Sequence, residues 1–92
     1  MEEEILSVGE FLTRVNSTLK GFRVKVFGEI TSVDIRGTYV FFSIKDKDDE
    51  SLLSCFMWQR SLQMSGISLE IGMVVAATGM PSVYKKFGRF TF

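Results

Sequence analysis

The spacing of apolar residues changes at Gly21, and this change restricts the fold more than any other feature of the sequence. Up to Leu19 the apolar side chains recur every three or four residues, as on one face of an α-helix. From Phe22 they alternate with polar residues, as in a half-buried β-strand. The sequence therefore predicts an amphipathic helix over residues 8–19 followed by a β-rich body. The helical face consists of Val8, Phe11, Leu12, Val15 and Leu19.

Both ends of this helix carry recognisable signals. Ser7 and Glu10 have the spacing of a capping box, in which each side chain accepts a hydrogen bond from the other residue's backbone N–H. Lys20 suits the negative end of the helix dipole, and Gly21 is predicted to end the helix in a left-handed C-cap.

Alternating segments predict the strands of the body. They cover residues 22–33, 38–46, 51–59 and 73–80, and a fifth strand begins close to Phe92 after a hairpin at residues 85–88. Gly28 interrupts the first segment, and a glycine inside a long strand indicates a bulge or a bend. Residues 60–65 predict a short helix or turn between the third and fourth strands.

This order of elements predicts an all-β fold with an N-terminal helix, namely the OB-fold, a five-stranded Greek-key barrel. The fifth strand is expected to be truncated. A small barrel of the SH3-like type is the alternative, but a short helix between strands three and four favours the OB-fold, where it plugs one end of the barrel. A chain of 92 residues can bury one core, so we expect residues 1–92 to be a single domain excised from a longer chain.

The composition excludes several classes of function. With 11 basic and 11 acidic residues the net charge is zero, so only the placement of the charges can indicate nucleic-acid binding. The chain has no histidine, which excludes histidine-based catalysis and imidazole metal sites within it. Cys55, the single cysteine, lies in an apolar run and is predicted to be a buried thiol.

Two further signals bear on location. No apolar run approaches membrane-spanning length. The N-terminus carries Glu2, Glu3 and Glu4, the opposite of a secretory signal. We therefore expect a cytoplasmic protein.

Catalysis and metal binding find little support. No serine has a histidine partner, and the sequence shows no glycine-rich phosphate loop. Acidic residues at positions 46, 48 and 50 have the spacing of a calcium loop, but the central glycine and the distal glutamate are missing. A solvated hairpin loop is the preferred interpretation, and we expect no catalytic residue, no metal and no cofactor in this chain.

The second and third strands carry aromatic residues on the face opposite the predicted core. If Val40, Phe42 and Ile44 point inward, then Tyr39 and Phe41 point outward, because successive side chains of a strand alternate. In the third strand Leu53, Cys55 and Met57 are predicted inward, and this leaves Phe56 and Trp58 outside.

Exposed aromatic rings on this face of an OB barrel, with nearby cations, are typical of single-stranded nucleic-acid binding: bases stack on the rings and Lys or Arg side chains follow the phosphates. The alternative for the aromatic residues is cover by the helix or by a neighbouring domain, and for the lysines a solvated hairpin tip. The predicted binding residues are Arg36, Tyr39, Phe41, Phe56, Trp58, Tyr84, Lys85, Lys86 and Arg89.

The order of motifs resembles a known family. The segments "ILSVGEFLTRVNSTLK", "VKVFGEITSV", "GTYVFFSIKD", "SCFMW" and "GMVVAATGMPSVYKKFGRF" are similar to the N-terminal OB domain of the exonuclease VII large subunit, over nearly the whole chain. The resemblance implies a domain that binds single-stranded DNA and delivers it to a nuclease domain beyond residue 92. It also implies a parent enzyme that works with a small helical subunit.

Two alternatives stay open at this stage. The first is a protein-docking barrel, in which Phe56, Trp58 and the helix contact other parts of a larger enzyme, or in which an exposed strand edge pairs with a second copy. The second is an RNA-binding domain like the anticodon-binding OB domains of aminoacyl-tRNA synthetases.

Overall fold

The computed structural model of the chain describes residues 3–92, so Glu2 of the acidic N-terminus lies outside the described residues. Helix α1 (Val8–Leu19) has the predicted bounds and the predicted capping box: Glu10 N–H donates to Ser7 Oγ at 3.1 Å, and Ser7 N–H donates to Glu10 Oε1 at 3.4 Å. The expected left-handed cap at Gly21 is wrong. The helix ends at Lys20 in right-handed geometry, and the Phe22 N–H satisfies the Leu19 carbonyl at 2.9 Å, so no left-handed residue is required.

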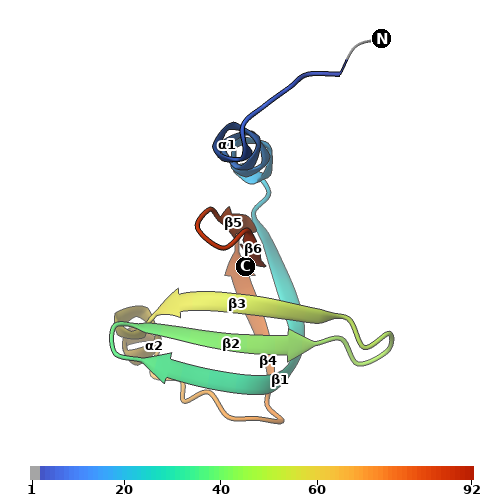
Figure 1. Cartoon of the computed structure of the whole chain (residues 1–92). Helices are drawn as coiled ribbons and strands as arrows, with labels where there is room; N and C mark the ends of the chain where they lie inside the picture. Colours follow the sequence, from blue (N-terminus) through green and yellow to red (C-terminus); the bar gives the residue numbers. More distant parts are fainter. Residues whose placement is uncertain (1–2) are drawn as a thin grey trace.

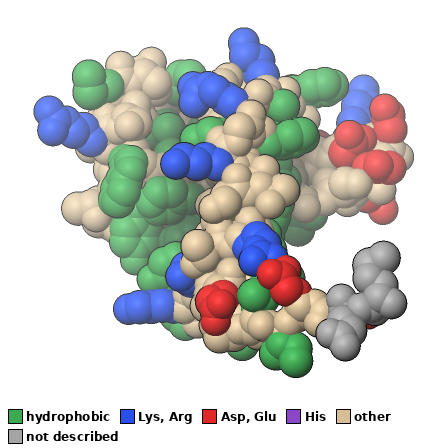
Figure 2. Space-filling view, turned by 90° about the horizontal axis from the view of Figure 1, so that it is seen from above, with side chains coloured by type: hydrophobic (Ala, Val, Ile, Leu, Met, Phe, Trp, Pro, Cys, Tyr) green, Lys and Arg blue, Asp and Glu red, His purple; other side chains and the backbone are tan. Residues whose placement is uncertain are grey.

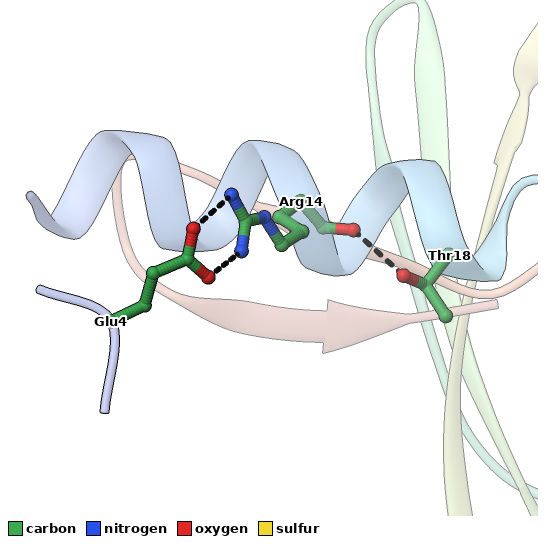
Figure 3. Close-up of polar contacts among 3 residues, drawn as sticks. All are labelled: Glu4, Arg14 and Thr18. Atoms are coloured by element: carbon green, nitrogen blue, oxygen red, sulfur yellow. Dashed lines mark hydrogen bonds and ion pairs between the residues drawn. The ribbon is translucent and has the colours of Figure 1, made fainter. Parts of the chain in front are cut away.

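Side-chain contacts tie the segment before α1 to the helix surface (Figure 3). Arg14 donates from both terminal guanidinium nitrogens to the Glu4 carboxylate, and Thr18 Oγ1 donates to the Arg14 carbonyl at 3.0 Å. These groups are exposed, so the ion pair contributes little to stability.

Within residues 3–92 we find no helix that is both long and apolar enough to cross a membrane.

The main sheet has the strand order β3-β2-β1-β4 and is antiparallel throughout. Its strands are β1 (Val24–Arg36), β2 (Tyr39–Lys45), β3 (Leu52–Trp58) and β4 (Val74–Gly79). Strand β1 is long enough to serve two neighbours: its first half pairs with β4 and its second half with β2. Figure 1 shows how β1 curves so that the sheet folds back on itself.

The predicted irregularity of β1 has two parts. The register shifts between Ile30 and Ser32, so the bulge lies at Thr31 rather than at the glycine. A Cβ added at Gly28 would lie 2.9 Å from the Lys45 carbonyl oxygen. Gly28 therefore permits β2 to approach β1 closely where the strand bends, which explains a glycine inside this strand.

The chain after β4 forms a hairpin of two short strands, β5 (Ser82–Tyr84) and β6 (Arg89–Thr91). This hairpin turns at the predicted residues 85–88, and β6 begins the predicted fifth strand. Phe92 extends it beside β3: Phe92 N–H donates to the Ser54 carbonyl at 2.9 Å, and Phe56 N–H donates to the Phe92 carbonyl at 3.0 Å. The Phe92 ring packs across to Gly79 of β4, so this residue bridges the two sides of a partly open barrel.

The core consists of the inward face of the sheet and one residue from helix α2 (Gln59–Ser65). Leu62 of α2 is buried at the end of the barrel, as the plug prediction required. The buried hydrophobic residues are Ile30, Val40, Phe42, Ile44, Cys55 and Leu62, and they confirm the predicted parity of β2 and β3. Burial raises the pKa of the Cys55 thiol to about 11, as expected for a neutral thiol in the core.

Candidate nucleic-acid interface

Four aromatic residues form one continuous surface on the outside of β2 and β3, and we call Tyr39, Phe41, Phe56 and Trp58 the aromatic face. The strand register places Tyr39 opposite Trp58 and Phe41 opposite Phe56. Neighbouring ring centroids are 5.2 to 6.1 Å apart, within the range of favourable edge-to-face and tilted pairs. Because side chains alternate along each strand and the two strands are paired in register, the four rings lie next to one another on one face.

The rings differ in how much of them solvent reaches. Trp58 is 58% exposed, whereas Tyr39, Phe41 and Phe56 are half-buried, because each of these three packs against at least two other rings. Phe41 carries an additional neighbour, since the Arg89 guanidinium carbon lies 5.8 Å from its ring centroid. This is cation–π distance, so Arg89 covers part of the ring that a base would use.

The β5–β6 hairpin forms the second wall of a groove above the aromatic face. The groove has a volume of about 810 Å³, and all nine residues predicted to bind nucleic acid line it. Figure 2, which views the molecule from above α1, shows Lys and Arg side chains beside a hydrophobic area, with most of the acidic side chains toward the edge of the view. Although the net charge is zero, four of the eleven basic residues line this groove and none of its lining residues is acidic.

The cations of the groove differ in their present partners. Arg36 Nε donates to Asp34 Oδ2 at 2.9 Å, and Lys85 Nζ donates to Thr13 Oγ1 of α1 at 2.8 Å. Lys86 is exposed at the hairpin tip. The Arg36 and Lys85 contacts are themselves solvent-exposed, so a phosphate can compete for these side chains at small cost.

Sequence reasoning missed five residues that line the groove, namely Asn16, Ser82, Val83, Phe87 and Thr91, and two of them bear on binding. Phe87 is 80% exposed at the hairpin tip, with its ring centroid 5.5 Å from that of Tyr84. The sequence contained an unused indication of Phe87, because an aromatic residue in a tight hairpin turn is expected at the surface. Asn16 of α1 also lines the groove, and no sequence pattern indicated this, because its partner is the backbone of Val83, 67 residues away.

The acidic loop between β2 and β3 has a structural use. Asp46 Oδ1 accepts hydrogen bonds from the backbone N–H groups of Asp48 and Asp49, at 2.7 and 3.2 Å. The Ser51 backbone N–H donates a hydrogen bond to Asp49 Oδ1 at 2.9 Å. This bond, together with the hydroxyl of Ser51, lowers the pKa of Asp49. Within residues 3–92 no three potential metal-ligating side chains gather at one point. The groove, with its aromatic rings and its cations, suits base stacking and ion pairing.

Comparison with known proteins agrees with this geometry. The family model described as "OB-fold nucleic acid binding domain" matches residues 6–92. The exodeoxyribonuclease 7 large subunit of Ligilactobacillus salivarius is 35% identical over 68 residues, which are 74% of this chain and 15% of the relative. The large subunit of Caldanaerobacter subterraneus is 36% identical over 67 residues, which are 73% of this chain and 16% of the relative.

A third relative, the exodeoxyribonuclease 7 large subunit of Streptococcus pneumoniae, is 30% identical over 69 residues. The matches span about one sixth of the length of these curated relatives. They confirm the predicted resemblance to exonuclease VII large subunits, and the family match confirms the OB-fold. The chain belongs to the family of OB-fold nucleic acid binding domains and is homologous to part of the exodeoxyribonuclease VII large subunit.

Proposed function

We propose that this domain binds single-stranded DNA in the groove between the aromatic face and the β5–β6 hairpin. The observation that carries the proposal is the meeting of four contiguous rings on one wall with cations on the other. Stacking on aromatic rings contributes about 1–3 kcal/mol per base and requires unpaired bases, so the groove favours single strands over duplexes.

In the parent enzyme the domain would hold the substrate strand for a nuclease domain in the remainder of the large subunit. The names of the relatives support this role, since they are exodeoxyribonuclease subunits of which the matched part is about one sixth. On this proposal the chain described here binds DNA while the bond cleavage, and the contact with a small helical subunit, belong to other parts of the enzyme.

Trp58 makes the proposal directly testable. It is the only tryptophan of the chain and lies on the aromatic face, so its fluorescence reports on the surroundings of the groove. Oligo-dT is titrated against the domain at about 50 mM and about 200 mM salt, and a duplex of the same length serves as the control.

Each phosphate neutralised on a single strand contributes about −0.7 to the slope of log K against log salt. Four phosphates, one for each of Arg36, Lys85, Lys86 and Arg89, give a slope of about −2.8. The affinity would then be about 50-fold weaker at the higher salt concentration. No fluorescence change at low salt, or binding that ignores salt, would refute the proposal.

Protein docking is a second candidate, favoured by the apolar face of α1. None of the residues of this helix is buried, and Val8 and Phe11 are 76% and 55% exposed. In this alternative α1 contacts another part of the enzyme or a second copy. Self-association that is insensitive to salt, measured by light scattering with the domain alone, would support docking through this face.

A further inference from the structure

Helix α1 and the β5–β6 hairpin are joined by an unusual contact. The side-chain amide of Asn16 bonds both backbone groups of Val83: Asn16 Nδ2 donates to the Val83 carbonyl at 3.0 Å, and the Val83 N–H donates to Asn16 Oδ1 at 2.7 Å. The amide therefore occupies the outer edge of β5 as a neighbouring strand would. Because Val83 N–H requires an acceptor and its carbonyl a donor, the orientation of the amide is unambiguous.

This contact lies at the point where the hairpin joins the groove. Asn16 and Val83 are both partly buried, and both line the groove beside the predicted binding residues. Two residues after Val83, Lys85 Nζ donates to Thr13 Oγ1, which lies one turn before Asn16 on the same helix. Figure 1 shows α1 above the hairpin, on the side away from the main sheet. The helix thus contacts the hairpin on the side opposite the main sheet.

The hairpin has few other constraints. Its two strands are three residues each and pair with one another in a two-stranded sheet separate from the main one. An isolated two-stranded hairpin is marginally stable in water, so its orientation depends on what it packs against. Strand β6 contacts the main sheet at two places: Phe92, which follows it, bonds β3, and the Arg89 guanidinium lies over the Phe41 ring of β2.

From these observations we infer that Asn16 is a positioning residue for DNA binding: its two hydrogen bonds to Val83 orient the hairpin so that Lys86 and Arg89 face the aromatic face. The inference rests on the proposed function, since it assumes that the groove binds DNA. Asn16 acts through the hairpin, and no contact between Asn16 and the DNA is required.

The expected effect follows from a population argument. A net neutral hydrogen bond shifts an equilibrium by about fivefold, so losing two shifts the orientation of the hairpin by up to about 25-fold. The apparent affinity falls by the fraction of molecules that remain competent to bind. We therefore expect Asn16→Ala to weaken oligo-dT binding about tenfold at both salt concentrations and to leave the salt slope unchanged, because the molecules that remain competent still present all four cations of the groove.

Two measurements test this inference. The first is the Trp58 titration of wild type and Asn16→Ala at two salt concentrations, with Thr18→Ala as the matched control. Thr18 lies on the same helix, and among residues 3–92 its hydroxyl bonds within that helix, to the Arg14 carbonyl (Figure 3). The second is amide hydrogen exchange, which should lose protection at Val83 in Asn16→Ala while the β1–β2 pairs keep theirs. Asn16→Asp retains the acceptor, so the Val83 amide should keep part of its protection.

The outcomes separate the two proposals. If wild type binds oligo-dT and Asn16→Ala binds with the same affinity and the same salt slope, the positioning role is overturned and the proposed function stands. If Asn16→Ala lowers affinity but leaves the protection of the Val83 amide unchanged, the role is also overturned. If wild type binds no oligonucleotide, the proposed function fails, and the role of Asn16 in binding fails with it. A uniform loss of protection across β1 and β2 would show a general folding role for Asn16 and would contradict the inference.

Discussion

Phe41 and Phe42 are neighbours in the sequence with opposite expected roles, and alanine substitution of each tests the strand parity on which the site depends. Phe42 is 7% exposed in the core. Removing a buried phenylalanine ring costs about 3–5 kcal/mol. Against a typical domain stability of about 5–15 kcal/mol, Phe42→Ala should strongly destabilise or unfold the domain.

Phe41→Ala should have a smaller effect on folding and a large one on binding. The ring forms two aromatic pairs, at 5.4 Å to Tyr39 and 5.5 Å to Phe56. Each pair contributes about 0.5–1.5 kcal/mol, so the loss of both costs about 1–3 kcal/mol of stability beyond the area burial of this half-exposed ring. Losing one stacked base costs a further 1–3 kcal/mol of binding, a reduction in affinity of about 5- to 150-fold.

Urea unfolding and oligo-dT titration, both followed by Trp58 fluorescence, separate these effects. The binding titration is made without urea, at a temperature where the unfolding curve shows that Phe41→Ala is folded. Unchanged affinity in a folded Phe41→Ala domain would refute stacking on this ring. A stability loss as large as that of Phe42→Ala would show that Phe41 belongs to the core and that the parity argument assigns it wrongly.

Four further tests address the fold. Gly28→Ala places a Cβ 2.9 Å from the Lys45 carbonyl oxygen and should lower the urea midpoint, equivalent to about 1–3 kcal/mol; Gly9→Ala, with open space around its Cβ, should not. Ser7→Ala removes the capping box and should cost about 1 kcal/mol, seen as a lower thermal midpoint; an unchanged midpoint would mean that α1 contributes nothing to stability. The pKa of Cys55 rises from 9.0 in a model thiol to about 11 in the fold, so between pH 9 and 11 the unfolded chain loses its proton first and stability should fall as pH rises. The same thiol should resist a disulfide reagent until urea unfolds the domain, and rapid reaction of the native protein would contradict its burial.

The strand parity and the helix could be predicted from the sequence because both follow from short-range backbone geometry. In a strand, side chains alternate whatever the strand pairs with, so Val40, Phe42 and Ile44 assigned Tyr39 and Phe41 to the other face. The capping box likewise involves residues three apart in the sequence. The left-handed cap failed because a tight turn with a Phe22 bond to Leu19 ended the helix instead, and sequence spacing does not distinguish these two endings.

The position of the hairpin could not be predicted in this way. Its cations were identifiable from residues 84–89, but their meeting with the aromatic face depends on contacts between distant parts of the chain. Asn16 bonds Val83 across 67 residues and Lys85 bonds Thr13 across 72. A single sequence carries no periodic signal for such pairs, so the role of Asn16 was not visible in it.

What the sequence by itself determined is which side chains share a face, because that depends on local geometry with a period of two or 3.6 residues. It thereby determined the inward side chains of β2 and β3 and the aromatic face, while the order of motifs indicated the family. Only the tertiary structure decided how much of each ring is exposed, that Arg89 covers Phe41, and that α1 holds the cationic hairpin over the rings. The physical reason is that the two walls of the groove come from distant parts of the chain. The distance between them depends on long-range contacts, which local sequence patterns do not encode.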